Sequence, residues 1–296
     1  MKFGSVEHPE KIDFTLPHDH PDTAKVLEKS NAKDKPKIYV GCAKWNKTDL
    51  KGFYPKGTKD ELTYYATQFN SIELTATFYN YSAEQFENWY GKTPADFKFF
   101  PKINQMISHR KRLNDADRYT EDFVNALSGL EEKMEQTFLQ LHDNFGPKNW
   151  DRLAHFITNF PKGIPLAVEV RHTDWLNDAE VADRFYALLE ENNVTNIITD
   201  TAGRRDLLHM RLTTPKAFMR YVGANHESDY ARLDDWFDRI KSWIEIGGLE
   251  DVYFFVHQNL EKASPLLSAY FIKRLNNELG YNLHVPEQQG GQTTMF

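Results

Sequence analysis

The sequence predicts an α/β protein built as a single-domain (β/α)8 TIM-type barrel with a polar N-terminal extension. Eight short apolar runs, each typical of a β-strand, alternate with helical patterns along the chain. Strands in such alternation pair in parallel, because the crossover helices cover the sheet. Eight βα units over about 250 residues also match the usual length of this barrel. A doubly wound open sheet is the alternative, but the first strand lacks the G-x-G-x-x-G dinucleotide fingerprint.

The expected strands are rich in β-branched and aromatic residues. They are 38–42, 71–77, 97–103, 137–141, 166–170, 196–199, 218–222 and 252–257. The expected helices carry apolar residues at a spacing of three or four. They are 60–69, 83–90, 121–134, 150–159, 178–192, 233–246 and 265–279. In the helix at 233–246, Trp236 and Trp243 stand seven residues apart and therefore belong to a core stripe.

Three stretches of different composition divide the chain. Residues 1–36 are polar and interrupted by prolines, so we expect an extension that packs on the barrel or stays loose. Its segment PHDHPD places His18 and His20 among carboxylates, which we interpret as a surface loop rather than a metal site. Residues 37–284 form the expected barrel domain, and 285–296 form a Gln- and Gly-rich tail that we expect to fray.

Composition narrows the class of protein. The chain has 296 residues and a formal net charge of −7, which argues against a nucleic-acid partner. The basic run at 109–112 is interpreted as a solvated face. The single cysteine, Cys42, permits no intrachain disulfide and is expected to be a buried, inert thiol. No apolar run reaches the length of a membrane span, and the first residues lack a secretory signal. We therefore expect a soluble cytoplasmic protein without a membrane partner.

The stretch LAVEVRHTDW at 166–175 is the most informative part of the sequence. It places one carboxylate, Glu169, inside a strand that reads as buried on both faces. A buried carboxylate is costly unless it is paired, and Arg171 can supply the partner. Two interpretations follow. The pair either holds the barrel rim together or forms a pocket floor in which an acid/base group lies beside an anion-binding group.

Further polar and aromatic residues lie in or just after the other strands. Since active sites of this fold lie at the carboxyl ends of the strands, we expect these side chains to converge. Carboxylates can move protons, Arg and Lys can hold an anion, and aromatic rings can stack on a substrate. The residues in question are Lys44, Trp45, Glu73, Thr75, Thr77, Lys102, Gln140, His142, Glu169, Arg171, His172, Asp200, Arg220, His257 and Asn259.

The order of motifs resembles the DUF72 family, also called YecE-like. The matching pieces lie within residues 38–259, and they are VGCAKW, FYP, YYATQFNSIELTATFY, FKFFPKI, ISH, LEEKMEQTFLQL, LAVEVRHTDW, DTAG and RYV. The resemblance implies a TIM-type barrel and no established reaction. It also implies a set of recurrent polar positions: Trp45, Glu73, Thr77, Tyr79, Lys102, Gln140, Glu169, Arg171, His172, Trp175, Asp200 and Arg220.

The chain departs from the family pattern in two places. His142 and Asp143 stand where the family commonly has two prolines, and 256–259 reads VHQN where it commonly has an aromatic residue followed by two asparagines. His142 and His257 therefore inherit less weight from the resemblance, and the chemistry at the rim of this chain can differ.

Three functions remain open. The first is an enzyme acting on a small polar, anionic compound such as a sugar or sugar phosphate. Its catalytic carboxylates would be Glu73, Glu169 and Asp200, of which Asp200 would orient the others or act as a second carboxylate. Arg171, Arg220 and Lys102 would clamp the anion. The other expected substrate-binding residues are Trp45, Thr77, Tyr79, Gln140, His172, Trp175, His257 and Asn259.

The second function is a divalent-metal-dependent isomerase or phosphodiesterase-like enzyme. Its ligands would be Glu73, Glu169, Asp200 and either His257 or His172. The nearby Arg and Lys residues count against it, because cations repel a metal ion. The third function is binding of a ligand or partner without turnover. The sequence leaves the cofactor, the substrate and the oligomeric state open.

Overall fold

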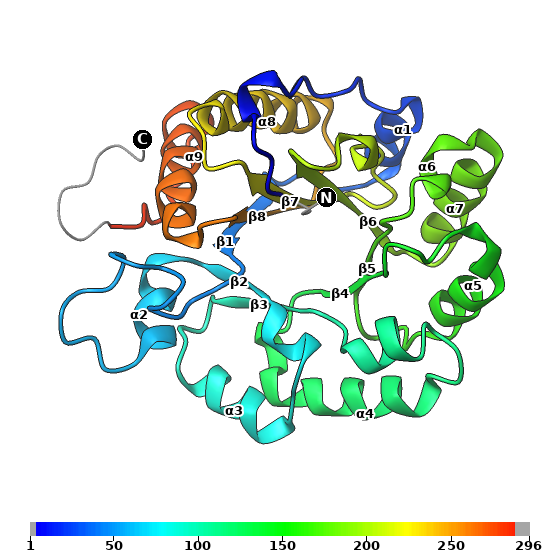
Figure 1. Cartoon of the computed structure of the whole chain (residues 1–296), viewed down its shortest axis with the longest axis horizontal. Helices are drawn as coiled ribbons and strands as arrows, with labels where there is room; N and C mark the ends of the chain where they lie inside the picture. Colours follow the sequence, from blue (N-terminus) through cyan, green and yellow to red (C-terminus); the bar gives the residue numbers. More distant parts are fainter. Residues whose placement is uncertain (1–3, 288–296) are drawn as a thin grey trace.

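Eight parallel strands carry the fold in the computed structural model, which describes residues 4–287. Backbone hydrogen bonds join six of them into one curled sheet in the order β1-β8-β7-β6-β5-β4, and join β2 to β3 in a second sheet. The strands surround a common centre and the helices lie outside them (Figure 1). The strands are β1 (Lys37–Cys42), β2 (Ser71–Leu74), β3 (Lys98–Pro101), β4 (Thr137–Gln140), β5 (Leu166–Glu169), β6 (Thr195–Thr201), β7 (Lys216–Gly223) and β8 (Asp251–Gln258).

The helices follow the predicted alternation. They are α1 (Pro21–Lys29), α2 (Glu61–Gln68), α3 (Ala83–Gly91), α4 (Asp117–Leu127), α5 (Trp150–Asn159), α6 (Asp174–Asn177), α7 (Ala179–Glu191), α8 (Ser228–Ile246) and α9 (Ser264–Leu279). Several begin at side-chain caps, which satisfy backbone N–H groups of the first turn. Asp60, Ser82 and Asp178 accept such bonds at the starts of α2, α3 and α7.

Several predicted elements are shorter than expected, and two of them show clear differences. The strand expected at 71–77 ends at Leu74, and Thr75–Phe78 forms a 3-10 turn. The Oγ1 of Thr77 lies 2.8 Å from the carbonyl of Leu74 and 2.6 Å from that of Lys102, so the hydroxyl binds backbone groups that would otherwise continue the ladder. The helix expected at 121–134 begins earlier, and its α-helical part ends at Leu127.

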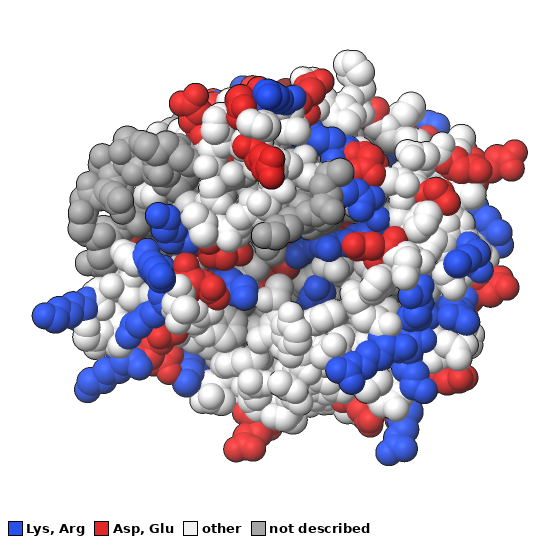
Figure 2. All heavy atoms as spheres, in the orientation of Figure 1, with Lys and Arg blue, Asp and Glu red and all other residues white. Residues whose placement is uncertain are grey.

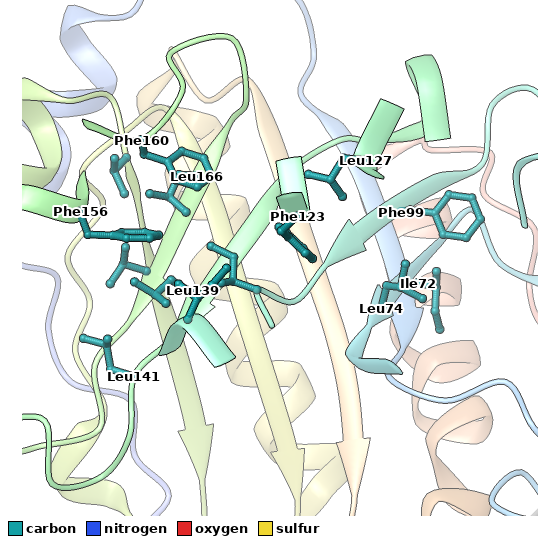
Figure 3. Close-up of a cluster of buried hydrophobic side chains, with 14 of the residues drawn as sticks. Ile72, Leu74, Phe99, Phe123, Leu127, Leu139, Leu141, Phe156, Phe160 and Leu166 are labelled. Atoms are coloured by element: carbon teal, nitrogen blue, oxygen red, sulfur yellow. The ribbon is translucent and has the colours of Figure 1, made fainter. Parts of the chain in front are cut away.

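Side chains alternate along each strand and fill two separate layers of core. Outward-facing Leu139 of β4, and Leu141 just after this strand, pack with Phe156 of α5 in a large apolar cluster (Figure 3). Inward-facing residues form a second, mostly aromatic cluster. Its members are Tyr39, Phe100, Phe138, Ala167, Ile197, Phe218, Tyr253 and Phe255. The interior between the strands is therefore packed with rings.

The strand pairing establishes a curled parallel sheet with helices around it. Backbone hydrogen bonding between neighbouring strands is weakest between β3 and β4 and between β1 and β2. Two isolated parallel bridges, Phe99 with Met134 and Lys102 with Phe138, join the segments of β3 and β4. Between β1 and β2 side chains replace the ladder. Asn70 donates to Ile38 O and accepts from Val40 N, and the Tyr65 hydroxyl lies between the Cys42 amide and Ser71 O.

The N-terminal residues pack on the helices and strands that follow, over the part of the chain that the structure describes. The amide of His20 donates to Met210 O, and Asp19 accepts from Trp243 Nε1 at 3.0 Å and from Arg239 at 2.5 Å. Residues 285–287 continue this packing at the other end, since Glu287 N donates to Gln68 Oε1. The rest of the expected tail, 288–296, lies outside the described residues.

The remaining expectations about composition can be compared with residues 4–287. Cys42 is completely buried, and burial raises the pKa of its thiol, as expected for an inert cysteine. Within this range, no helix combines the length and the apolar character that a bilayer span needs.

The seam between β1 and β2 requires glycine at position 41. A Cβ atom there would lie 2.3 Å from Ser71 O, so one of the strands would have to move. We expect Gly41→Ala to lower the free energy of unfolding by about 1–3 kcal/mol, measured by urea denaturation. Gly163→Ala is the control, because a Cβ at 163 meets no atom within 4 Å. Equal stability of the two variants would contradict the close approach.

Candidate functional site

Arg220 of β7 is the centre of a buried polar cluster between the strands. Its Nε and NH2 donate to the two carboxylate oxygens of Glu73 at 2.9 and 2.8 Å. Its NH1 donates to Glu169 Oε2 at 2.5 Å and lies 3.3 Å from Gln140 Oε1. Glu73, Glu169 and Arg220 are all at most 5% exposed. One guanidinium therefore joins carboxylates from β2 and β5.

The period-2 alternation of strands explains why these residues meet. Inward-facing Phe138, Ala167 and Phe218 are followed two positions later by Gln140, Glu169 and Arg220. The same spacing leads from Phe100 to Lys102 and from Phe255 to His257. These polar residues together therefore form a layer next to the apolar cluster, on the side of the carboxyl ends of the strands.

Lys102 belongs to the same layer but has different partners. Its Nζ donates to Gln140 Oε1 at 2.9 Å and lies 4.3 Å from the centre of the Phe78 ring. Among the residues that the structure describes, no carboxylate lies within 4.0 Å of this amine. The side chain is 9% exposed. Lys102 is thus a buried cation without a direct counter-ion.

Two further residues extend the cluster toward solvent. Arg171, just after β5, donates from Nε to Glu169 Oε1 at 2.7 Å. His257 of β8 places Nε2 2.8 Å from Glu73 Oε2. Arg171 is the partner that the sequence indicated for Glu169. The structure shows that Arg220, 51 positions away in sequence, is a second one.

The carboxylates stay ionised despite their burial. Burial alone raises the pKa of Glu169, but the charges of Arg171 and Arg220 outweigh it and lower the pKa to about 2. Burial likewise opposes ionisation of Glu73, and Arg220 and His257 hold its pKa well below the usual range. At neutral pH both groups therefore accept hydrogen bonds and do not supply protons.

The pKa of Lys102 is lowered toward neutrality, because burial and the neighbouring positive charges act in the same direction. Burial, and then the positive charges of Arg220 and Arg171, lower this pKa to about 7. The amine of Lys102 therefore loses its proton far more readily near neutral pH than the amine of an exposed lysine. A group with such a pKa suits proton transfer or nucleophilic attack.

The sequence patterns did not predict the aromatic rings that pack beside Lys102. His109 was expected on a solvated face, but its ring lies 4.8 Å from Phe78 and 5.2 Å from His142, centre to centre. Burial and the neighbouring charge of Lys102 lower the pKa of His109 to about 4, so the ring is neutral at pH 7. The signal available in the sequence was the ISH segment, which follows the β3 motif.

Asp200 does not belong to the cluster, which corrects the prediction that it is a site carboxylate. It faces outward from β6 toward α8. There its oxygens accept from Trp236 Nε1 at 2.8 Å and pair with Arg232 at 2.9 Å, and Arg205 also binds it. The register of β6 is the reason, because Asp200 alternates with the inward-facing set that contains Ile197.

Three aromatic residues expected to bind substrate lie elsewhere. Trp175 is completely buried, and its Nε1 donates to Phe145 O, so it fills the core. Trp45 packs edge-on against Trp89 of α3 at 5.4 Å. Tyr79 is 65% exposed and contacts Phe78 on the outer side of the 3-10 turn. The Tyr79 ring is linked to the charged layer through Phe78, whose ring lies over Lys102.

The other predicted binding residues have separate positions. Thr77 is buried and binds backbone carbonyls at the ends of β2 and β3. His172 borders a surface depression of 690 Å³ that it shares with Lys148 and Asp174. Asn259 donates to the carbonyl of Gly4 at 2.9 Å, which places the N-terminal extension beside the ends of β7 and β8.

The geometry does not favour the metal-dependent alternative. Within residues 4–287, no three His, Cys, Asp or Glu side chains are grouped so that they could hold a metal ion. Glu73 and Glu169 instead bind the guanidinium of Arg220, and Asp200 faces the opposite side of the sheet. A cation in the cluster would also lie beside Arg220 and Lys102, which repel it.

The face of the molecule drawn in Figure 2 is hollowed near its middle. Atoms of both basic and acidic side chains lie inside this depression. A separate cavity of 580 Å³ lies at the amino ends of β5, β6 and β7, lined by residues such as Gln136, Thr195 and Lys216. In parallel α/β folds, ligands bind at the carboxyl ends of the strands rather than at this end. The candidate site is therefore the charged layer at the carboxyl ends.

The fold and the cluster define a parallel α/β protein with a buried charged site at the carboxyl ends of its strands. The sequence profile described as "Protein of unknown function DUF72" matches residues 39–290, so the chain belongs to the DUF72 family. It is 26% identical over 277 residues to the UPF0759 protein YecE of Escherichia coli (strain K12). That alignment covers 85% of this chain and 98% of the relative.

Solved structures of the family show the same fold. A DUF72 family protein from Thermotoga maritima MSB8 is 25% identical, with a TM-score of 0.68, and the match covers 81% of this chain and 100% of that one. Another from Enterococcus faecalis V583 is 17% identical, with a TM-score of 0.67, over 81% and 98% of the two chains. The family resemblance inferred from the motifs is thus confirmed, and the family has no established function.

The two ion pairs of Glu169 make it a structural as well as a candidate functional residue. We expect Glu169→Gln to lower the free energy of unfolding by roughly 3–5 kcal/mol, because the amide leaves Arg171 and Arg220 without their buried counter-charge. Urea denaturation at pH 7 measures the change. Glu180→Gln, at an exposed position of α7, is the control and should be neutral. A loss below about 1 kcal/mol would contradict a tightly paired Glu169.

Lys102 should have the opposite effect on stability. The pKa of an unfolded lysine is about 10.4, whereas Lys102 titrates near 7 in the fold. The native state therefore disfavours the charged amine, and this penalty is full below pH 7 and disappears by about pH 10.4. We expect Lys102→Met to raise the free energy of unfolding at pH 6 by roughly 2–4 kcal/mol, with a gain that shrinks as the pH rises.

Lys133→Met is the matched control for this experiment. Lys133 is also buried, but its Nζ donates to Tyr90 O, Thr93 O and Thr93 Oγ1. Its removal leaves buried acceptors unpaired and should lower stability by about 1–3 kcal/mol. Destabilisation of both variants at pH 6 would show that Lys102 is an ordinary structural lysine.

Proposed function

We propose that the chain is an enzyme acting on a small polar, anionic compound of the sugar or sugar-phosphate class, bound above the Arg220 cluster. The observation that carries the proposal is the charge balance of the buried layer. Three basic side chains, Arg171, Arg220 and Lys102, face two carboxylates, Glu73 and Glu169. With Lys102 protonated the layer has a surplus positive charge, and an anionic ligand would neutralise it.

The proposed roles differ from those that the sequence suggested. Arg220 is fixed by both carboxylates, so we assign it to the scaffold. Arg171 and Lys102 are the cations nearest the open side and would attract the anionic group. The low pKa values of the carboxylates make them poor proton donors, whereas Lys102 titrates near neutrality and suits proton transfer.

We further propose that the eight strands form a closed (β/α)8 barrel over residues 37–284, with residues 1–36 as an extension. The close approach of Gly41 to Ser71, and the Tyr65 hydroxyl between β1 and β2, support closure at one seam. The bridge between Lys102 and Phe138 supports it at the other. A single buried cysteine also fits a cytoplasmic location, which remains part of the proposal.

Non-catalytic binding is the competing function. The same charged layer could hold a ligand or a partner's acidic group without reaction. Turnover separates the two possibilities. Incubation of the full chain with any stabilising compound, followed by mass spectrometry or NMR, should reveal a product if the chain is an enzyme. Tight binding with an unchanged ligand would instead support the binding protein.

A thermal-shift experiment tests the anion preference directly. We expect ribose 5-phosphate or glucose 6-phosphate to stabilise the fold, by about 2.7 kcal/mol at one hundred times the dissociation constant, and glucose to have a much smaller effect. The shift should be lost in Arg171→Met and retained in Arg152→Met, which removes an exposed arginine of α5. Equal shifts in both variants, or none with any anion, would contradict the proposal.

A further inference from the structure

We propose that Lys102 is a nucleophilic lysine that forms a Schiff base with a carbonyl group of the anionic substrate. This inference rests on the proposed function, and it narrows the substrate to an aldehyde or ketone that carries a phosphate or carboxylate. It also gives Lys102 a role distinct from that of a simple anion-binding group.

Position is the first argument. Lys102 directly follows β3 and pairs with Phe138 of β4, so its backbone is held by the sheet. Its carbonyl also accepts from the Thr77 hydroxyl at 2.6 Å. A side chain on so rigid a support can present its amine at a fixed point above the apolar layer, as a covalent catalyst requires.

The surroundings of the amine are the second argument. One hydrogen bond, to Gln140 Oε1, and the face of Phe78 are its recorded contacts within the described residues. Lys133 provides the contrast inside the same molecule, because three oxygens hold its Nζ and fix it as a structural group. The amine of Lys102 keeps hydrogen-bonding capacity that the protein does not use.

The charges facing the amine are the third argument. Arg220 from β7 and Arg171 after β5 oppose its protonation, while Glu73 of β2 and Glu169 of β5 favour it. Burial and the two arginines prevail. Desolvation together with neighbouring cations is the arrangement that activates a lysine for attack on a carbonyl. His109, from the segment Met106–Arg110, contacts the same Phe78 ring.

The chemical step needs no further reactant. The uncharged amine attacks the carbonyl carbon, a C–N bond forms, and the π electrons of the C=O bond move to oxygen. That oxygen takes the proton that the nitrogen gives up. The nitrogen lone pair then forms the C=N bond as the C–O bond breaks, and water leaves after a second proton transfer. Amine and carbonyl thus become an imine and one water molecule, with no oxidation or reduction.

Borohydride trapping of the full chain tests the proposal. The protein is incubated at pH 7.5 with glyceraldehyde 3-phosphate, dihydroxyacetone phosphate or pyruvate, reduced with sodium borohydride, and analysed by intact-mass and peptide mass spectrometry. We expect one adduct at Lys102, formed about 100-fold faster than at an exposed lysine, because far more of the Lys102 amine is uncharged at this pH. The phosphate and carboxylate compounds show which anion is preferred.

Variants make the assignment specific. The adduct should disappear in Lys102→Arg and in Lys102→Met, which offers a second fold-compatible replacement, and persist in Lys148→Arg at an exposed rim position. Adducts spread over surface lysines, and unchanged in the Lys102 variants, would overturn the proposal.

Glycerol 3-phosphate separates this inference from the proposed function, because it carries the anion without a carbonyl. If glycerol 3-phosphate stabilises the fold but none of the carbonyl compounds forms an adduct at Lys102, the Schiff base is refuted and the anion site remains. Absence of both the stabilisation and the adduct would refute both proposals.

Discussion

The structure depends on one buried guanidinium. Arg220 joins Glu73 of β2 to Glu169 of β5 across the interior, and these strands belong to two sheets that share little backbone hydrogen bonding. A buried ion pair is often no more stable than an apolar replacement, but it is far more stable than either partner left alone. The cluster therefore specifies how the two sheets meet. Removal of any one member would leave a charge in the core without its partner.

The ion pairs of Arg220 also determine the electrostatic environment of Lys102. Glu73 and Glu169 both pair with Arg220, and Glu169 also pairs with Arg171. Neither carboxylate lies within ion-pair distance of Lys102 in the described structure. The same arginines that stabilise the carboxylates disfavour a charged lysine. Functional sites commonly retain an ionisable group in an unfavourable environment, because the burial and the charges that destabilise it also make it reactive. Lys102 fits this description, whereas fully hydrogen-bonded Lys133 does not.

The sequence predicted the alternation of elements well, because period-2 and period-3.6 patterns are local and strong. It also placed Glu73, Gln140, Glu169, Arg171 and Arg220 in one layer, since residues at matching strand ends converge. It failed for Asp200 and Trp175. Whether a residue of a wholly buried strand faces inward or outward depends on register, and both faces of β6 are buried. The contact of His109 with Phe78 depends on a loop path that no periodicity encodes.

The N-terminal extension imposes a further condition on any ligand. Asn259, which follows β8, binds the carbonyl of Gly4, and a Cβ at Gly4 would lie 2.6 Å from Val222 at the end of β7. Arg205, which holds Asp200, also donates to the carbonyls of Phe14 and Thr15. The extension thus packs against the carboxyl ends of β6, β7 and β8, on the side of the cluster formed by His257. We therefore propose that a ligand reaches Lys102 from the other side of the cluster, where the rings of His109 and His142 lie 5.2 Å apart.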